Sequence, residues 1–266
     1  MLSASSQPTH LEPSELGNKE YWDSLYDLEI ANNAQDPSDV GTIWFDDCSA
    51  EDKAVDFLRS SKLSLDRNTT TFLDLGTGNG HFLFRLREGE EDESDEEDGD
   101  NDTDDCMTQG NGFNGRMLGV DYSERSVEFA KRIADSKDLG SGQPHCVDFK
   151  VWDLINQSPS GIVLDDQNES GWDVVLDKGT FDAISLSNDK DNQGRRICES
   201  YKERIVPLVK VGGRFFVTSC NWTEDELKAW FQGGPLEYED CVRYKSFSFG
   251  GKKGQSISSL CFRRIT

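Results

Sequence analysis

The sequence has few basic residues for its length. Lysine and arginine together number 28 among 266 residues, against 51 aspartates and glutamates, and the formal net charge at pH 7 is −23. Non-specific binding to nucleic acids depends on basic side chains that neutralise phosphates. The composition therefore predicts no direct nucleic-acid partner, and it favours a partner with a basic protein surface.

Long apolar runs and metal-ligand spacings are also missing. No stretch approaches the roughly 20 apolar residues that cross a bilayer, so we expect no membrane-embedded role. The seven cysteines are dispersed without C-x-x-C spacing and only three histidines could join them, so we expect no metal site. Scattered thiols and a polar N-terminus without a signal-peptide core predict a reducing, cytoplasmic location.

The acidic excess is concentrated in one segment. Residues 88–105 hold 13 acidic residues and no Lys or Arg, and setting them aside reduces the net charge from −23 to −10. The wider segment 88–114 has almost no apolar residues, which predicts a disordered insertion. Its alternative role is docking a basic partner. Residues 1–18 are expected to form a disordered tail before a single domain over residues 19–266.

The remaining sequence alternates between expected strands and helices. Strands are expected over residues 70–75, 116–121, 146–152, 171–177 and 211–219, and helices over 79–87, 123–137 and 195–209. Such alternation predicts an α/β fold with a doubly wound, Rossmann-like parallel sheet, because each crossover covers a face of the sheet.

The two ends of the chain add further elements. A helix is expected to begin at Lys19, and a second helix over residues 49–59 has Ser49 as its cap. Residues 242–249 and 256–264 flank a glycine-rich turn, which predicts a C-terminal hairpin.

A glycine turn follows the first expected strand. Gly76 and Gly78 can adopt backbone conformations that a Cβ disfavours, so main-chain N–H groups can close on a ligand. A dinucleotide fingerprint would need a glycine where the chain has His81, which disfavours a nicotinamide oxidoreductase. The acid before the turn, Asp74, suits a cationic ligand. The alternative is a glycine turn without any ligand.

Acidic residues end four of the expected strands. They are Asp74, Asp121, Asp153 and Asp177. Open α/β sheets bind ligands at the carboxyl ends of their strands, so these acids are predicted to surround one crevice. Without the insertion, Asp121 follows Gly76 by about 18 residues, close to the spacing of an acid that binds ribose hydroxyls. The alternative for each acid is a turn, and for Asp121 a helix N-cap.

Several motifs together resemble a known family. Residues 74–80, DLGTGNG, resemble motif I of class I S-adenosylmethionine (SAM) methyltransferases. With DKGT at 177–180, GVDYS at 119–123, SCNWT at 219–223 and the aromatic pairs at 21–22 and 44–45, the chain resembles the translation elongation factor 1-alpha lysine methyltransferase family from about residue 15 onward. The resemblance implies a seven-stranded sheet with an antiparallel C-terminal strand, SAM as cofactor and elongation factor 1-alpha as protein substrate.

The resemblance also implies roles for individual residues. Methyl transfer needs an unprotonated amine, and Asp177 is the expected catalytic group that orients this amine or accepts its proton. The expected cofactor-binding residues are Trp44, Asp74, Gly76, Thr77, Gly78, Gly80, Asp121, Tyr122, Asp153, Leu154 and Asp177. Trp22, Phe45 and Trp222 are expected to form aromatic walls around the substrate. Ordinary packing is the alternative for each aromatic residue, and a structural ion pair is the favoured role of Lys178.

We therefore expect a monomeric, cytoplasmic, SAM-dependent protein-lysine N-methyltransferase. One alternative is a small-molecule N- or O-methyltransferase, which would use the same cofactor residues. A catalytically silent methyltransferase-fold binding module is the other, and the intact glycine motif after Asp74 disfavours it.

Replacing residues 88–114 with a short Gly-Ser loop should preserve both melting temperature and SAM affinity. The segment lacks the apolar residues of a packed element, and shortening a loop changes its closure free energy by only fractions of a kcal/mol. Thermal unfolding and calorimetric titration check this expectation. Loss of turnover with SAM binding intact would instead assign the segment to substrate docking.

Overall fold

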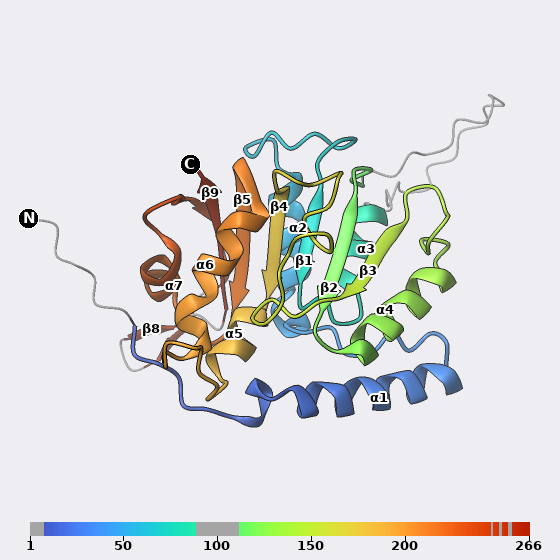
Figure 1. The fold of residues 1–266 in the computed structure, drawn as a ribbon, viewed down its shortest axis with the longest axis horizontal. Helices are drawn as coiled ribbons and strands as arrows, with labels where there is room; N and C mark the ends of the chain where they lie inside the picture. The colour runs from blue at the N-terminus through green and yellow to red at the C-terminus, as the bar shows by residue number, and fades with distance from the viewer. Residues whose placement is uncertain (1–7, 89–111, 246, 250–251, 255–256) are drawn as a thin grey trace, which may run out of the picture.

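A seven-stranded sheet forms the centre of the molecule (Figure 1). The computed structural model describes residues 8–88, 112–245, 247–249, 252–254 and 257–266. The sheet has the order β3-β2-β1-β4-β5-β9-β6. Its strands are β1 (Phe72–Leu75), β2 (Met117–Asp121), β3 (Val147–Val151), β4 (Trp172–Lys178), β5 (Val209–Ser219), β6 (Leu236–Cys241) and β9 (Ser258–Arg264). The first five are parallel and β9 runs antiparallel to both neighbours, which confirms the predicted fold.

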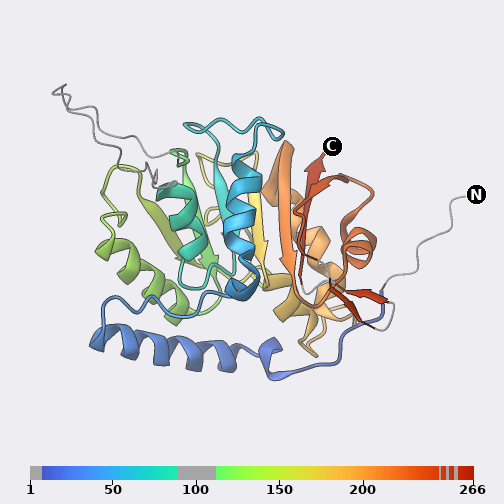
Figure 2. The ribbon, with the colours of Figure 1, turned by 180° about the vertical axis from the view of Figure 1, so that it is seen from behind.

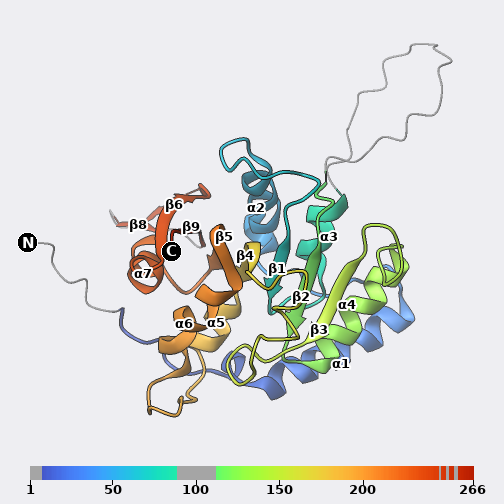
Figure 3. The same cartoon turned by 45° about the horizontal axis from the view of Figure 1, so that its top comes forward.

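Helices cover both faces of the sheet (Figures 1 and 2). On one face lie α2 (Ala50–Arg59), α3 (His81–Glu88) and α4 (Glu124–Ser136), and on the other α5 (Thr180–Ser185), α6 (Tyr201–Ile205) and α7 (Glu224–Phe231). Along β1, Phe72 belongs to one apolar cluster and Leu73 to the other. Successive strand residues point to opposite faces, so a strand between two helical layers is apolar throughout. Figure 3 shows the sheet lying between these layers.

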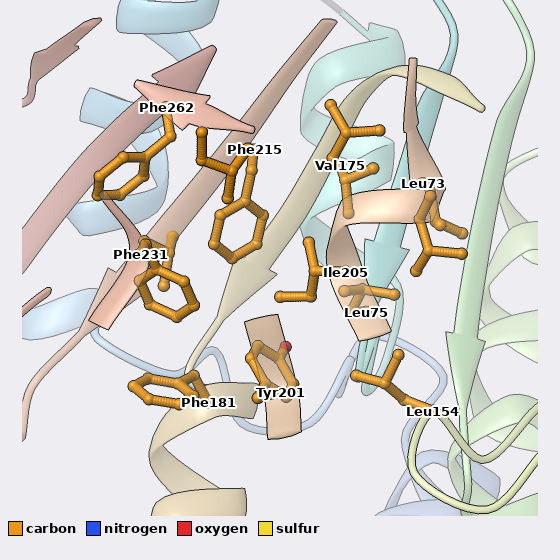
Figure 4. Packing of buried hydrophobic residues seen from close by; sticks show 14 of the residues in the cluster. Leu73, Leu75, Leu154, Val175, Phe181, Tyr201, Ile205, Phe215, Phe231 and Phe262 are labelled. Atoms are coloured by element: carbon orange, nitrogen blue, oxygen red, sulfur yellow. The ribbon is translucent and has the colours of Figure 1, made fainter. Parts of the chain in front are cut away.

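Aromatic rings dominate the core beneath α5, α6 and α7 (Figure 4). The Phe181 ring centroid lies 5.1 Å from that of Tyr201 and 4.9 Å from that of Phe231, and Phe231 lies 5.0 Å from Phe215. Rings at such separations add stabilisation beyond the apolar area that they bury. This cluster fixes α5 against β5 and thereby positions the residues that follow β4.

A long helix, α1 (Lys19–Gln35), runs past the carboxyl ends of the parallel strands (Figure 1). Only Tyr26, Glu29 and Asn33 are buried in it, and polar contacts attach it to α4. The Ser123 hydroxyl donates to Asp23 at 2.6 Å, and an exposed ion pair joins Arg125 to Asp27 at 2.9 Å. Exposed ion pairs contribute little, so α1 is held more weakly than the core helices.

The N-terminal prediction needs a correction. Residues 8–18, assigned to a disordered tail, follow a defined path, and Glu15–Gly17 form a 3₁₀ turn. The Ser14 N–H donates to the Leu186 carbonyl at 3.0 Å, and the Arg196 guanidinium donates to the Leu11 carbonyl at 2.6 Å. These partners lie far along the chain, so local composition did not reveal them. Residues 1–7 lie outside the described part of the chain.

Two other element predictions were wrong in part. The expected helix over residues 195–209 is a short α6 between 3₁₀ turns, because Pro207 lacks the N–H that a continuing helix requires. The final strand does not pair with residues 242–249 as predicted. It pairs with β5 and with β6. β6 is an edge strand, and its acidic residues are the reason that the sequence did not predict a strand there. The predicted hairpin is nevertheless present in a shorter form, because β7 (Phe247–Phe249) and β8 (Lys252–Gly254) pair at the glycine-rich turn.

The caps of the second and fourth helices differ from each other. Ser123 caps α4 through its side chain, which accepts the Ser126 N–H. Ser49 occupies the cap position of α2 in the left-handed region, with φ 47°, and its side chain makes no capping hydrogen bond. Ser49 therefore serves as a backbone turn and not as the predicted cap.

The two ends of the acidic insertion meet at the end of α3. The Phe113 N–H donates to the Leu86 carbonyl at 2.9 Å, and Phe113 is fully buried, so residues 112–114 do not belong to a disordered loop as predicted. Arg87 donates to the carbonyls of Phe113, Gly115 (2.8 Å) and Cys146 (3.3 Å). A loop replacement that preserves the melting temperature must therefore retain Glu88 and residues 112–114 and cover only residues 89–111, the rest of the predicted insertion, which lie outside the described residues.

Arg87→Met should destabilise the fold, because it leaves three carbonyl groups without their guanidinium donor. We expect the free energy of unfolding to fall by roughly 2–3 kcal/mol, since a single unsatisfied buried acceptor costs about 1–3 kcal/mol. Urea denaturation followed by circular dichroism measures this change. The matched control is Arg85→Met on the same helix, which removes an exposed ion pair to Asp52 and should change stability by less than about 0.5 kcal/mol. Equal effects of the two changes would refute the role of Arg87.

Candidate functional site

A cavity of about 620 Å³ opens at the carboxyl ends of β1, β2 and β4, beside α1. Its volume is in the range of small-molecule sites. Eleven of the predicted site residues line it: Trp22, Trp44, Phe45, Asp74, Gly76, Thr77, Gly78, Asp121, Tyr122, Asp153 and Leu154. Parallel strands bring their ends to one edge, so residues from distant parts of the chain meet there.

The glycine turn is required by the packing around it. Gly76 and Gly78 have φ values of 62° and 58°, in the left-handed region that favours glycine. A Cβ on Gly76 would lie 2.1 Å from Thr180 Oγ1, and one on Gly78 would lie 2.8 Å from the Tyr26 hydroxyl oxygen. Thr180 also donates to the Leu75 carbonyl at 2.6 Å, which ties the turn to α5.

Asp121 links the glycine turn to the start of α4. Its carboxylate accepts the N–H groups of Gly78 at 3.2 Å and Ser123 at 2.9 Å. Ser123, and not Asp121, occupies the N-cap position, so the N-cap alternative for Asp121 is wrong. Burial raises the pKa of the Asp121 carboxyl, and these N–H groups oppose that shift. A carboxylate oxygen with one N–H partner can still accept a hydroxyl from a ligand.

A buried ion pair lies beside Asp74. Asp74 is 3% exposed, and burial raises its pKa to about 7, although the charge of Lys178 opposes the shift. Lys178 Nζ lies 3.5 Å from a Glu51 carboxylate oxygen and donates to the Trp44 carbonyl at 3.4 Å. Glu51 also contacts the His81 ring. The structural ion pair that the sequence favoured for Lys178 is therefore present, and it fixes the segment before α2.

Aromatic rings form the wall of the cavity next to α1. The Trp22 and Trp44 centroids lie 5.4 Å apart, and Trp22 Nε1 donates to the Leu16 carbonyl at 2.8 Å. Phe45 has φ 69°, and its ring lies 5.9 Å from Lys178 Nζ. Tyr26 also lines this wall. Such rings can surround a cationic group.

Asp153 caps the turn after β3 and also lines the cavity. It accepts the N–H groups of Ile155 at 2.8 Å and Asn156 at 3.0 Å. Asp153 therefore forms a turn, as the alternative predicted, and it also lines the cavity.

Three predicted site residues are not brought to the cavity. Asp177 is 0% exposed, and its carboxylate accepts hydrogen bonds from the Thr180 and Phe181 N–H groups and, at 2.5 Å, from the Tyr201 hydroxyl. Trp222 is buried against Phe181 and Trp230. A Cβ on Gly80 would collide with the Phe149 ring at 2.6 Å. These three residues lie behind the residues that line the cavity, and direct ligand contacts for them stay predictions.

Several polar residues of the cavity wall were not predicted from the sequence, and Asp182 and Asn221 are two of them. Asp182 lies five residues after Asp177, in the first turn of α5, and Asn221 follows β5. Asn221 belongs to the predicted SCNWT motif, and Asp182 lies two residues after the DKGT motif. Which motif residue faces a ligand depends on the direction of the chain after each strand, which composition and spacing do not contain.

The buried carboxylates favour a positively charged ligand. Asp74, Asp121 and Asp182 line the cavity, and none forms an ion pair within the described residues. A buried carboxylate without a cation is costly, and a cationic ligand reduces that cost. The described residues contain no group of three His, Cys, Asp or Glu side chains that could hold a metal ion. They also include no helix with the length and apolar character to cross a membrane.

Comparisons with known proteins agree with this geometry. Residues 66–259 match the family described as "Methyltransferase domain". The chain is 36% identical over 254 residues to "Protein-lysine N-methyltransferase EFM4" of Saccharomyces cerevisiae, covering 95% of this chain and 96% of that protein. It is 32% identical over 253 residues to human "EEF1A lysine methyltransferase 2", covering 95% and 88%.

A likeness to a solved structure supports the fold. The structure of magnesium protoporphyrin IX methyltransferase (ChlM) from Synechocystis PCC 6803 with bound SAM has a TM-score of 0.53 at 14% identity, covering 92% of this chain and 94% of that chain. At this identity the likeness establishes the methyltransferase sheet and not the substrate.

Asp177→Asn tests whether this acid serves the fold. Burial raises the pKa of Asp177 to about 7, whereas an unfolded aspartate titrates near 3.9. Between about pH 4 and 7 the folded state retains a proton that the unfolded state has released, so this group's contribution to stability decreases as the pH rises. The variant lacks this titrating carboxyl. We therefore expect the difference in free energy of unfolding between wild type and variant, taken as wild type minus variant, to decrease as the pH rises across this range.

Urea denaturation at successive pH values measures this difference. Asp173→Asn, at the other end of β4, is the control with the opposite sign. Burial acts to raise the pKa of Asp173, but hydrogen bonds from Thr71 and Lys210 lower it below the ordinary value. Its contribution is therefore lost as the pH falls. A pH-independent difference for Asp177→Asn would contradict the expectation.

Proposed function

Because the chain belongs to the methyltransferase family that includes yeast EFM4 and human EEF1A lysine methyltransferase 2, we propose that it methylates a lysine of elongation factor 1-alpha. Identity above 30% across nearly the whole of both chains supports a shared activity. The observation that carries the proposal is the convergence of buried carboxylates and aromatic rings on one cavity at the sheet edge.

The residues of the cavity fit S-adenosylmethionine, the cofactor of this enzyme family. We propose that Asp121 accepts hydrogen bonds from the ribose hydroxyls. The N–H groups of Gly78 and Ser123 already hold its carboxylate in one orientation. We propose that Asp153 and Leu154 meet the adenine edge and that Tyr122 covers its face, because all three line the cavity. We propose that the turn from Gly76 to Gly78 and the carboxyl of Asp74 also contact the cofactor. The lack of an ion-pair partner for Asp74 within the described chain suits a cationic cofactor.

The protein's contribution to the reaction is to align and desolvate the reactants. When bound, SAM supplies an electrophilic methyl group on a positively charged sulfur. A free lysine has a pKa near 10.4, so the enzyme must favour the neutral amine or receive its proton. Trp22, Trp44 and Phe45 exclude water and can surround the cationic groups. Asp177 acts indirectly, since it holds the N-terminal turn of α5 through two N–H groups.

The net charge of −23 supports a basic protein surface as the partner. We further propose a monomeric enzyme that acts in the cytoplasm, without direct contact to nucleic acid. Residues 19–266 are proposed to form one catalytic domain, to which the preceding residues 8–18 are attached.

The decisive experiment is incubation of recombinant elongation factor 1-alpha with the purified enzyme and SAM. Peptide mass spectrometry should find one lysine that gains the mass of one or more methyl groups. If no lysine gains mass while a metabolite extract is methylated, the small-molecule alternative replaces this proposal.

Asp121→Ala provides the matched inactive control. Loss of the carboxylate should weaken SAM binding by about 10- to 100-fold, since a hydrogen bond to a charged group contributes roughly 1.5–3 kcal/mol. Calorimetric titration measures the affinity, and circular dichroism verifies that the variant is folded. Wild-type affinity in this variant would remove Asp121 from the cofactor site.

A further inference from the structure

Asp182 is a buried carboxylate that the cofactor does not account for. It lies in the first turn of α5, lines the cavity and is only 4% exposed. The proposed ribose acid, Asp121, ends β2, whereas Asp182 bonds to the end of β5, three strands away in the sheet order. Neighbouring strands are about 4.8 Å apart, so these two sites are separated by roughly 14 Å along the sheet edge.

Hydrogen bonds hold the Asp182 carboxylate in one orientation. The Ser219 oxygen accepts the N–H groups of Asn221 at 3.1 Å and Trp222 at 2.9 Å, which leaves its own proton for Asp182 Oδ1 at 2.5 Å. The Cys220 N–H donates to Asp182 Oδ2 at 2.8 Å. Both carboxylate oxygens therefore act as acceptors, which favours the ionised form.

Asp182 has no counter-charge of its own. None of the described lysines, arginines or histidines lies within ion-pair distance of it, whereas buried Glu51 contacts both Lys178 and His81. Asp177 is equally buried, and donors surround both carboxylates, but Asp177 does not line the cavity whereas Asp182 does. Asp189 and Asp191 also line this side of the cavity but are not buried, so Asp182 is the buried carboxylate there that a cationic group from outside can reach.

We propose that Asp182 is the catalytic carboxylate that binds the amine of the target lysine and accepts its proton. This inference rests on the proposed function. The lysine ammonium transfers one proton to the carboxylate, which yields a neutral amine and a carboxylic acid. The amine nitrogen then donates its electron pair to the methyl carbon, while the electron pair of the carbon–sulfur bond stays on sulfur. The products are a methylated ammonium and a neutral thioether, so charge and atoms balance.

Kinetics of Asp182→Asn test this role. We expect kcat/KM for elongation factor 1-alpha to fall about 100-fold, the low end for loss of a general base, while the Kd for SAM stays within about twofold. The pH profile separates a catalytic from a structural role. Without an internal acceptor, the remaining activity should rise about tenfold per pH unit between pH 7 and 9, following deprotonation of the free amine. The wild-type profile should be flatter.

Asp225→Asn is the control, because Asp225 is an exposed acid on α7 that carries the same charge. Its kcat/KM should stay within about twofold of wild type. Unchanged kcat/KM in Asp182→Asn, or a parallel loss of SAM affinity and melting temperature, overturns the inference. A wild-type enzyme that leaves elongation factor 1-alpha unmodified refutes the proposed function instead, and the inference falls with it.

Ser219→Ala supplies a second test if Asp182→Asn does not fold. This change keeps the carboxylate but removes a hydrogen bond that lowers the pKa of Asp182 against the larger, raising effect of burial. The acidic limb of the kcat/KM profile should therefore move to higher pH. A limb at the wild-type position overturns the inference, because a purely structural Asp182 has no titration that affects the rate.

Discussion

The burial of carboxylate charge at one edge of the sheet is the constraint on which the site depends. Asp74, Asp121, Asp177 and Asp182 are at most 6% exposed, and no described cation pairs with them. The protein offsets part of the cost with N–H and hydroxyl donors from the turns after β1, β2, β4 and β5. Asp177 is fully satisfied within the fold, whereas the other three retain a face toward the cavity, where positive charge is needed.

Weakly attached elements close over this charged edge. The core helices bury apolar faces, but α1 contributes few buried residues and depends on the Ser123 hydroxyl and exposed ion pairs. The segment before it is held by carbonyl contacts to Arg196 and by the Leu186 carbonyl. Elements of low local stability are suited to open and close, and this cover carries Trp22 and Tyr26 to the cavity. Cofactor exchange and substrate entry can therefore proceed without disturbing the aromatic core.

Most of the fold and several acids of the cavity wall were predictable, because both follow from rules that act along the chain. Alternating strands and helices require a parallel sheet, and acids at strand ends meet at its edge. Asp74, Asp121 and Asp153 lie at the cavity for this reason. The hidden strand β6 and the ordered residues 8–18 escaped prediction, because their stability comes from partners distant in sequence. Glu239 of β6, for example, pairs with Arg214 of β5 at 2.7 Å.

The sequence by itself determined the class of sheet, the glycine turn and the set of acids available to the site. Only the tertiary structure decided which acid of residues 177–183, DKGTFDA, lines the cavity. Asp177 and Asp182 are five residues apart, so spacing cannot distinguish them. The Tyr201 hydroxyl on α6 draws Asp177 into the core, while Ser219 and Cys220 after β5 hold Asp182 at the cavity wall. The direction of each side chain is thus set by hydrogen-bond partners 24 to 38 residues away, which meet the motif only after the sheet has formed.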